Sequence, residues 1–303
     1  MSAIDGSGTA GVNVQVESAH SVTTDGAGYF QTEIDRTGNL GVVLTGGSIV
    51  ERRTTVNGPT LGRPRLSLIP NTFDLRAFDE MFRTANGRLQ RWTSRPSLVV
   101  IATVMSYRNP DDQYMTTGEQ MSEEEVTALI QHLTEGLTLL TGSTFTSFAD
   151  VSVERPASGV RVLVVRPGTI VVGRYNGIQT FAQTIGYGRW AEDSNGSVTG
   201  GSMFLDRTFD RDDNRRRLLR IHELGHALGY LHVETRTSIM NPAIGPEPTE
   251  FDRTAAIVAF QRQPGNVSPD TDPQGVAGNP FKPRETMWVA PVACLDARTT
   301  PRF

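Results

Sequence analysis

Cysteine is almost absent from this sequence, since Cys294 is the only one among 303 residues, and aromatic residues make up 7%. A single cysteine excludes an intrachain disulfide and says little about the compartment. The net charge of −4 lacks the basic surplus of a nucleic-acid-binding protein. No run of about 18 apolar residues occurs, so the sequence predicts no membrane span. What remains is a globular chain, large enough for one large domain and a small one.

Histidine is also scarce, with five in the chain, yet three of them share one short segment with Glu223. On an α-helix, His222 and His226 lie about 40° apart around the axis and about 6 Å apart along it. One zinc ion can therefore reach both rings. Glu223 then lies on the flank of that face, where it can hold a water at the ion. We interpret the other two histidines, His20 and His132, as surface or core residues.

The third histidine of the segment can join the other two only if the helix ends before it. In a continuous helix, His232 would lie about 9 Å beyond His226, too far for a Zn–N bond of about 2.0–2.1 Å. Gly229 permits the end, because a left-handed turn costs glycine little and brings the chain back. The sequence thus predicts a zinc site made by His222, His226 and His232, with Glu223 as the catalytic residue. An ordinary amphipathic helix that carries histidines is the alternative.

This extended histidine motif resembles that of the metzincin zinc endopeptidases, whose second signature is a Met-turn. Shortly after His232, the run Thr-Ser-Ile-Met-Asn-Pro looks like the Met-turn of the matrixin-like branch. The resemblance implies that Met240 forms an apolar floor beneath the three imidazoles, with Gly229 and Pro242 as structural residues of the site. Asn241 replaces the His-Tyr pair of astacin-like and serralysin-like members, so this turn supplies no tyrosine.

The segment before the motif agrees with the same resemblance. Residues 197–206 resemble the glycine-led strand that precedes the active-site helix in matrixins, and residues 184–190 would be the edge strand along which a peptide substrate pairs. A plain glycine-flanked strand is the alternative. The residues assigned to this substrate edge strand are Gly186, Tyr187, Gly188, Arg189 and Trp190. Residues 193–196 favour a plain turn, with a calcium loop as in some relatives as the alternative.

We expect an α+β fold in which a small all-β sandwich precedes the metzincin-like catalytic domain. The sandwich covers residues 1–60, where valines alternate with polar residues. A Thr-Asp-x-x-Gly-x-Phe run there, leading into an aromatic strand, resembles the carboxypeptidase regulatory-like, transthyretin-like domain. Residues 61–96 read as a linker with a helix. The catalytic domain, residues 97–265, would be a mixed twisted β-sheet with long helices and the Met-turn. Residues 266–303 read as an irregular tail rich in proline and glycine, with Trp288 as an anchor.

Several helices are marked by local signals. Ser122 and Glu125 form a capping box that opens a helix ending near residue 141, and residues 249–262 predict the final helix. The active-site helix is expected to begin at an Asp212 or Asp213 N-cap. Its arginines predict a solvated basic face. Pairing with nearby aspartates, including Asp210, or binding of an acidic substrate are the alternatives.

The resemblance implies a zinc-dependent endopeptidase that hydrolyses peptide bonds by a metal-activated water, with Glu223 as general base. Zn²⁺ is the expected cofactor, Ca²⁺ a second candidate, and a protein or peptide the expected partner. The alternatives are a catalytically idle metzincin-like protein that binds a surface glycan or protein through its sandwich, and a zinc enzyme acting on a non-peptide amide. Because the resembled group is generally secreted, we expect an extracellular protein whose leader is absent from this sequence, with the cytoplasm as the alternative. A propeptide cysteine can cap the zinc in matrixins, but Cys294 lies outside any such motif, so we interpret it as an inert thiol.

Overall fold

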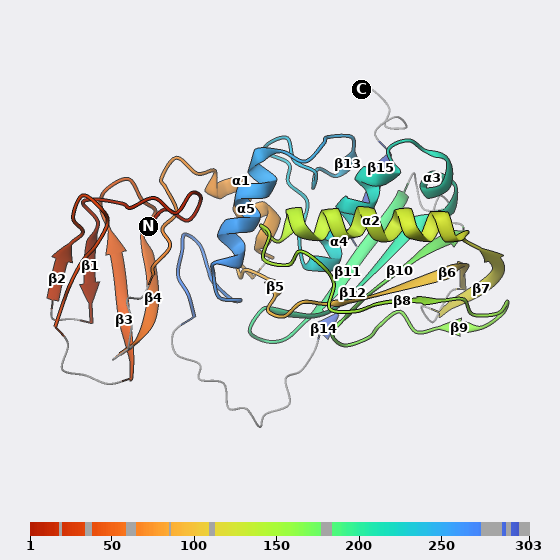
Figure 1. Ribbon diagram of the computed structural model, residues 1–303, viewed down its shortest axis with the longest axis horizontal. Coiled ribbons are helices and arrows are strands. Elements are labelled where there is room, and N and C mark those ends of the chain that lie inside the picture. The colour runs from red at the N-terminus through yellow and green to blue at the C-terminus, as the bar shows by residue number, and fades with distance from the viewer. Residues whose placement is uncertain are drawn as a thin grey trace.

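The computed structural model describes residues 1–17, 20–33, 38–58, 65–84, 86–108, 113–176, 184–273, 287–288 and 292–296. These residues form a mixed α/β structure with five helices and two sheets, which is compatible with the predicted α+β class. Figure 1 shows a small sheet module beside a larger module in which helices cover a long sheet.

The N-terminal module is a four-stranded antiparallel sheet in the order β2-β1-β3-β4. Its strands are β1 (Asn13–Val16), β2 (His20–Thr23), β3 (Gly38–Thr45) and β4 (Arg52–Gly58). Val14, Val42 and Leu44 are buried on one face of the sheet together with Leu68. Intervening residues are more exposed, as the alternating valines predict.

The sandwich predicted for residues 1–60 is not what the described residues form, because they contain one sheet and no second sheet facing it. The run that carried the resemblance makes a turn, in which the Asp25 carboxylate accepts the N–H groups of Ala27 and Tyr29 at 2.9 Å. Residues 26–33 then continue without a strand, and the Tyr29 side chain is exposed. The prediction of an aromatic strand after this turn is therefore wrong. The turn satisfies its own backbone groups, and the chain that follows it is irregular.

The larger module is built on an eleven-stranded sheet whose main path is β13-β15-β11-β12-β10-β6-β7-β9. Off this path, β14 pairs with β11, β5 with β12 and β8 with β6. The strands are β5 (Arg91–Trp92), β6 (Ser97–Arg108), β7 (Gln113–Gln120), β8 (Val151–Glu154), β9 (Arg161–Val162), β10 (Thr169–Asn176), β11 (Thr184–Glu192), β12 (Ser197–Asp206), β13 (Ala243–Ile244), β14 (Met287–Trp288) and β15 (Val292–Asp296).

Strand β6 lies inside the sheet, parallel to β10 and antiparallel to β7. Its apolar run is buried on both faces: Leu98 and Val100 belong to the main core, whereas Val99 and Ile101 belong to a second cluster on the opposite face. A continuous apolar run is typical of such a strand.

Five helices are described: α1 (Leu75–Phe82), α2 (Glu123–Leu140), α3 (Arg207–Asp212), α4 (Arg216–Leu228) and α5 (Glu250–Phe260). The capping box predicted for α2 is confirmed, because Ser122 and Glu125 exchange side chain-to-backbone hydrogen bonds of 3.2 and 2.7 Å. The predicted linker helix is α1, and the predicted final helix is α5, with Thr249 as N-cap. Helix α4 contacts α2 on one side and strands β11 and β12 on the other, so its motif lies in the core (Figure 1).

The C-terminal tail is not irregular throughout, as had been expected for residues 266–303. Strands β14 and β15 add to the outer side of β11, with Trp288 opposite Ala191 and Cys294 opposite Gly186. Backbone pairing needs no periodic apolar pattern in a segment this short, so these two strands could not be predicted from the local sequence.

Buried ion pairs join the two modules. Arg262 of the large module makes two hydrogen bonds to Asp270, at 2.6 and 2.8 Å. Arg52 of strand β4 contacts Asp270 and donates to Asp272 at 2.8 Å. All four side chains are buried, so the small sheet is attached to the larger module by a desolvated charge cluster. We call these four residues the junction cluster. In the described part of the chain, no helix is long and apolar enough to cross a membrane.

Candidate metal centre

Helix α4 reaches the core because small residues let its neighbours come close. A Cβ at Gly136 of α2 would lie 3.1 Å from the Leu224 side chain, and a Cβ at Gly201 of β12 would lie 2.7 Å from the Ala227 carbonyl oxygen. At Gly225 an added Cβ would collide with the Met240 sulfur. The helix is thus packed tightly on three sides, which fixes the direction of every side chain it carries.

The helix ends at Gly229, as predicted. Gly229 has φ 103°, in the left-handed region, and its N–H donates to the His226 carbonyl at 3.0 Å while the Tyr230 N–H donates to the Gly225 carbonyl at 3.0 Å. This pattern of bonds is a Schellman cap. It reverses the chain and brings His232 back beside the helix.

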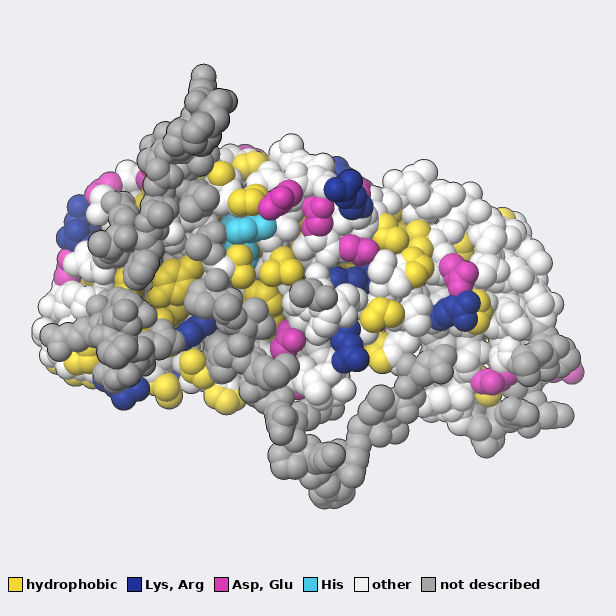
Figure 2. Space-filling model, turned by 180° about the vertical axis from the view of Figure 1, so that it is seen from behind, with side chains coloured by type: hydrophobic (Ala, Val, Ile, Leu, Met, Phe, Trp, Pro, Cys, Tyr) yellow, Lys and Arg dark blue, Asp and Glu magenta, His cyan; other side chains and the backbone are white. Residues whose placement is uncertain are grey.

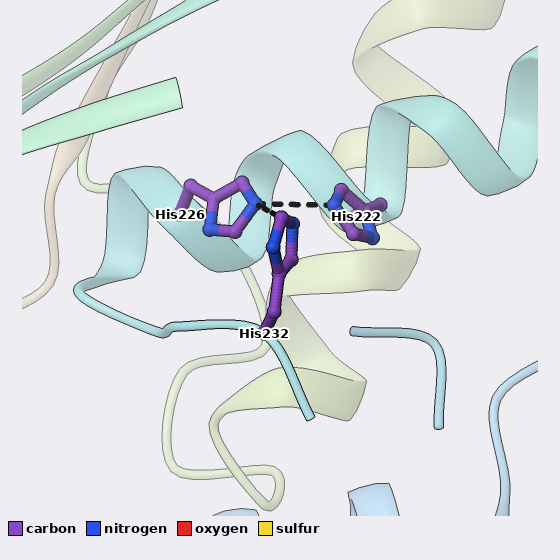
Figure 3. Close-up of side chains that lie close together, drawn as sticks. All are labelled: His222, His226 and His232. Carbon is purple, nitrogen blue, oxygen red and sulfur yellow. Dashed lines mark hydrogen bonds between the residues drawn. The ribbon is translucent and has the colours of Figure 1, made fainter. Parts of the chain in front are cut away.

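Three imidazole rings converge as a result (Figure 3). The Nε2 atom of His226 lies 3.1 Å from that of His222 and 3.2 Å from that of His232. His222 and His226 are fully buried, whereas His232 is partly exposed. Figure 2 shows histidine atoms reaching the surface on one face of the molecule, beside hydrophobic side chains. The structure therefore brings together the three residues that the sequence proposed as ligands.

Backbone carbonyls orient two of the rings. His222 Nδ1 donates to the Ile239 carbonyl at 2.7 Å, and His226 Nδ1 donates to the Tyr230 carbonyl at 2.7 Å. In a neutral ring with its proton on Nδ1, Nε2 carries a lone pair. The two Nε2 atoms that face each other at 3.1 Å then have no proton to share. A cation bound between them would remove this repulsion.

The donor set fits zinc in type and in spacing. Ligands of a tetrahedral ion with Zn–N bonds of about 2.1 Å lie about 3.4 Å apart, close to the 3.1 and 3.2 Å between these nitrogens. Burial lowers the pKa of His222 to about 3 and that of His232 to about 4, and it lowers the pKa of His226 in the same direction. The rings are therefore neutral at physiological pH, which is the form that binds metals.

Glu223 lies beside these rings without any polar partner. Its side chain is fully buried, and neither carboxylate oxygen has a hydrogen-bond partner among the described residues. Burial raises its pKa well above the ordinary value. Strand β11 makes room for it, since a Cβ at Gly186 would lie 2.5 Å from Oε1, and one at Gly188 would lie 2.5 Å from His226 Cβ. These two glycines of the expected substrate strand thus face α4 and accommodate the site.

The segment expected to form a Met-turn is held from both sides. Met240 is fully buried and lies against Gly225 of α4, and Asn241 donates to the Val233 carbonyl at 2.6 Å. Asp252 of α5 accepts hydrogen bonds from Ser238 and from the Ile239 N–H. The same turn presents the Ile239 carbonyl to His222, so α5 indirectly orients a candidate ligand. Pro242 follows the turn and is partly buried.

The expected substrate strand is not an open edge in this structure. On one side β11 pairs with β12, and on the other it pairs antiparallel with β14 and β15. Tyr187 and Arg189 alternate with the glycines and therefore point to the face of the sheet away from α4. There the Tyr187 ring stacks on the Phe204 ring, with 4.6 Å between the ring centroids. Trp190 is fully buried and donates to Glu192 at 2.9 Å. Among these side chains, therefore, none reaches a substrate on the side of α4.

Cys294 is the residue that the sequence did not assign to the site. The Cys294 Sγ, a ring nitrogen of His222 and a carboxylate oxygen of Glu223 all lie within 4.8 Å of one another, so the thiol that the sequence led us to interpret as inert lies beside the site. The side chain is fully buried. Only the pairing of two strands more than a hundred residues apart in the sequence places it there, and no local pattern announces such a pairing.

The beginning of α4 also differs from expectation. Residues 207–212 form a separate helix, α3, capped by Asp206, and α4 starts at Arg216 without a side-chain cap. Asp213 instead accepts the Arg215 N–H at 2.8 Å, just before the helix. The N-cap role predicted for Asp212 or Asp213 is therefore wrong.

The basic face of α4 is solvated only in part. Arg216 is exposed, but Arg220 is buried and makes hydrogen bonds of 2.6 and 3.0 Å to Asp210. Arg220 also contacts His132 Nδ1 at 3.1 Å, so His132 is a structural neighbour of this pair. Pairing with aspartate, the alternative reading, holds for Arg220.

The turn at residues 193–196 is an Asx turn. Asp193 accepts the N–H groups of Asn195 and Ser197 at 2.9 and 3.0 Å, and Gly196 has φ 83°. Among the described residues, the groups with metal-ligand spacing are the three histidines, and His222 with Glu223 and Cys294. Among the described residues, no cluster of acidic side chains with the spacing of calcium ligands lies at this turn.

Neither a protein-family model nor a curated protein sequence matches this chain. The function must therefore be argued from the site itself: three converging imidazoles, a buried carboxylate beside them, and a strand of the same chain along the neighbouring sheet edge.

Proposed function

We propose that this chain is a zinc-dependent endopeptidase with a metzincin-like catalytic domain of the matrixin-like branch. The observation that carries the proposal is the convergence of three imidazole Nε2 atoms beside the buried, unpartnered carboxylate of Glu223. Three protein ligands that leave a further position open are typical of catalytic zinc sites. The Gly229 cap and the turn at Met240 support the same assignment, because they build the third ligand and the support beneath the helix.

His222, His226 and His232 would hold the ion. When bound there, zinc supplies a Lewis acid that polarises a carbonyl and lowers the pKa of water. The carbonyls of Ile239 and Tyr230 fix the rings of His222 and His226 so that their Nε2 atoms face each other and could hold an ion. Such outer hydrogen bonds commonly raise the affinity of a metal site.

Glu223 supplies the proton transfer. Its carboxylate lies within 4.8 Å of a His222 ring nitrogen, and no described residue donates a hydrogen bond to it. A carboxylate in this place accepts the proton of the attacking water and passes it to the leaving amine. Burial raises the pKa of this carboxyl, which makes its ionised form a stronger base toward water.

A peptide would bind by strand addition. In this structure β15 lies between the outer side of β11 and the short strand β13 and pairs with both, so a peptide would take this position in place of β15. Main-chain hydrogen bonds on both sides would hold an extended peptide whatever its side chains. Its backbone would then pass in front of Gly186, next to Glu223. This geometry favours a peptide over a compact substrate.

Digestion of a peptide library by the purified full-length chain tests the proposal. Cleavage should disappear with a chelator and return with added zinc, at one zinc per chain by elemental analysis. Glu223→Gln should keep the zinc and lower turnover by about 10²–10⁴, the usual contribution of a general base. Equal turnover by this variant and the wild type would show that Glu223 is not the base. Cleavage that continues unchanged in the presence of a chelator would show that the reaction does not use a metal.

A further inference from the structure

Strand β15 lies in the position that the proposed function assigns to a peptide substrate. Its residues 292–295 pair antiparallel with β11, and residues 295–296 pair parallel with β13 on the other side. An extended peptide that is bound by strand addition makes main-chain hydrogen bonds of this kind. A segment of the same chain is therefore held as a peptide would be held.

The register of this pairing brings Cys294 beside the candidate catalytic residue. Cys294 is opposite Gly186, and directly opposed residues of an antiparallel pair point to the same face. Its side chain therefore points toward α4. A Cβ added at Gly186 would lie 2.5 Å from Oε1 of Glu223, so only glycine at this position leaves room for the carboxylate. The backbone of β15 at Cys294 is thus one strand away from the residue that directly contacts Glu223.

The Cys294 side chain lies next to Glu223 and outside the set of three histidines. The groups with metal-ligand spacing are separate: His222, His226 and His232 form one, and His222, Glu223 and Cys294 form the other. The thiol is therefore not placed at the point that the three Nε2 atoms share. It is fully buried, and it lies where a side chain of a bound peptide would lie beside the catalytic residue.

The peptide bond that precedes Cys294 lies between the levels of Glu223 and of the second histidine. Two residues before Cys294, Val292 is opposite Gly188, and a Cβ added at Gly188 would lie 2.5 Å from Cβ of His226. The backbone of β15 thus passes from the level of His226 to the level of Glu223 within these residues. A bond that is hydrolysed at this site must be within reach of both, and the bond before Cys294 lies in this interval.

We propose that the chain is its own substrate and hydrolyses the peptide bond between Ala293 and Cys294. The inference rests on the proposed function, since the same site and the same carboxylate act. Water adds to the carbonyl carbon of Ala293, the carbon–nitrogen bond breaks, and the proton that Glu223 takes from the water goes to the amine of Cys294. The products are a chain that ends in the Ala293 carboxylate and a peptide of residues 294–303, so no oxidant or reductant is consumed.

Intact-mass measurement of the full-length chain tests this cleavage directly. After zinc is added, the wild type should release residues 294–303, and Glu223→Gln should release them about 10²–10⁴ times more slowly. Because the substrate is held by the same chain, the rate constant should stay the same when the protein concentration is raised about tenfold. Absence of this fragment, or a rate constant that rises with protein concentration, would overturn the inference.

A charged residue at position 294 tests which side chain lies beside the catalytic residue. Cys294→Arg should slow the release of the tail at least about tenfold, because it would place a charge at a fully buried position. Leu163→Arg is the matched control. Leu163 is exposed and follows β9, at the opposite end of the sheet from β11, so this variant should release the tail at the wild-type rate. Equal rates in both variants would contradict the placement of Cys294.

Alkylation of the thiol gives a reading that needs neither metal nor turnover. Cys294 is the only cysteine and is buried while β15 is paired, so the mass increase with iodoacetamide reports the departure of β15 from β11. In the metal-free chain, a synthetic peptide of residues 290–298 with Cys294→Ala should compete for the same position. At about ten times its Kd for that position, it should speed alkylation about tenfold. The same residues in scrambled order should have no effect, and an unchanged rate with the first peptide would overturn the inference.

Cleavage of a peptide library separates this inference from the function on which it rests. Zinc-dependent cleavage of the library by a chain whose tail stays intact supports the endopeptidase and overturns the cleavage of the tail. If the peptide of residues 290–298 speeds alkylation but neither the tail nor the library is cleaved, the chain binds peptides without hydrolysing them, and both proposals are overturned.

Discussion

Two buried polar clusters in this chain are built on opposite rules. In the junction cluster, Arg52, Arg262, Asp270 and Asp272 neutralise one another and are linked by hydrogen bonds as short as 2.6 Å. At the candidate metal centre, two imidazoles of the same polarity face each other, and the carboxylate of Glu223 has no partner among the described residues.

The difference between the clusters teaches which of them was shaped by folding alone. Burial of charge without pairing is costly, so a cluster that only holds modules together satisfies its members. A cluster that breaks this rule gains nothing for the fold. Such violations concentrate at functional sites, where a missing partner is an ion or a substrate. Four predictions test this contrast, in order of decreasing effect.

Asp270→Asn should give the largest loss of stability. It leaves Arg262 and Arg52 buried without their shared counter-charge, and removal of one partner from a buried ion pair typically costs about 3–5 kcal/mol. Urea unfolding of the metal-free protein measures the change. Exposed Glu250, paired with Arg253 on the surface, supplies the control: Glu250→Gln should leave the free energy of unfolding nearly unchanged, because surface ion pairs contribute little. Similar losses in both variants would contradict the distinction.

Zinc should stabilise the wild type by a comparable but smaller amount. At a free zinc concentration 100 times the Kd, binding to the native state alone contributes about 2.7 kcal/mol, seen as a rise in Tm. In His226→Ala this rise should vanish, whereas it should persist in Asp270→Asn. A rise of equal size in His226→Ala would place the ion elsewhere.

The metal-free protein should lose stability as the pH falls below about 6.5. Burial lowers the pKa of His222 to about 3 and that of His232 to about 4 from the ordinary 6.5. The unfolded chain therefore binds protons in this window that the native protein does not, and stability decreases with decreasing pH. Each such ring contributes up to about 1.4 kcal/mol per pH unit. Urea midpoints from pH 7 to 5 should fall less steeply in His222→Gln, and an unchanged slope would show that this ring is not buried in its neutral form.

Glu223→Gln should have the smallest effect on stability and, unusually for a buried position, a favourable one. Replacing an unpaired carboxyl by a neutral amide removes part of the burial penalty, and we expect a gain of about 1–2 kcal/mol in the metal-free protein. Turnover should be lost in the same variant. A marked destabilisation would mean that Glu223 has a structural partner, contrary to the isolation described above.

The local features of the fold could be predicted from the sequence because each depends on neighbouring residues. The capping box at Ser122, the left-handed end at Gly229 and the run of β6 were all legible in this way. The candidate ligands were equally legible, since two lie on one helical face and a glycine brings in the third. The roles given to these residues and to Glu223 stay predictions.

What the sequence could not supply was pairing at long range. The position of Cys294, the covered edge of β11 and the burial of Arg220 against Asp210 depend on which segments meet after folding. Residue propensities and hydrophobic periodicity describe local sequence and do not indicate which distant segments will contact each other. The predicted sandwich differs from the single sheet that the described residues of the N-terminal module form, for a related reason: a short turn motif indicates a turn and not the strands around it.

The junction cluster fixes how the two modules lie relative to each other. Arg52 belongs to the small sheet and Asp270 to the large module, so the two modules tumble together as one body and are not joined by a flexible linker alone. The distance and orientation between the small sheet and the three histidines are therefore fixed by this buried contact.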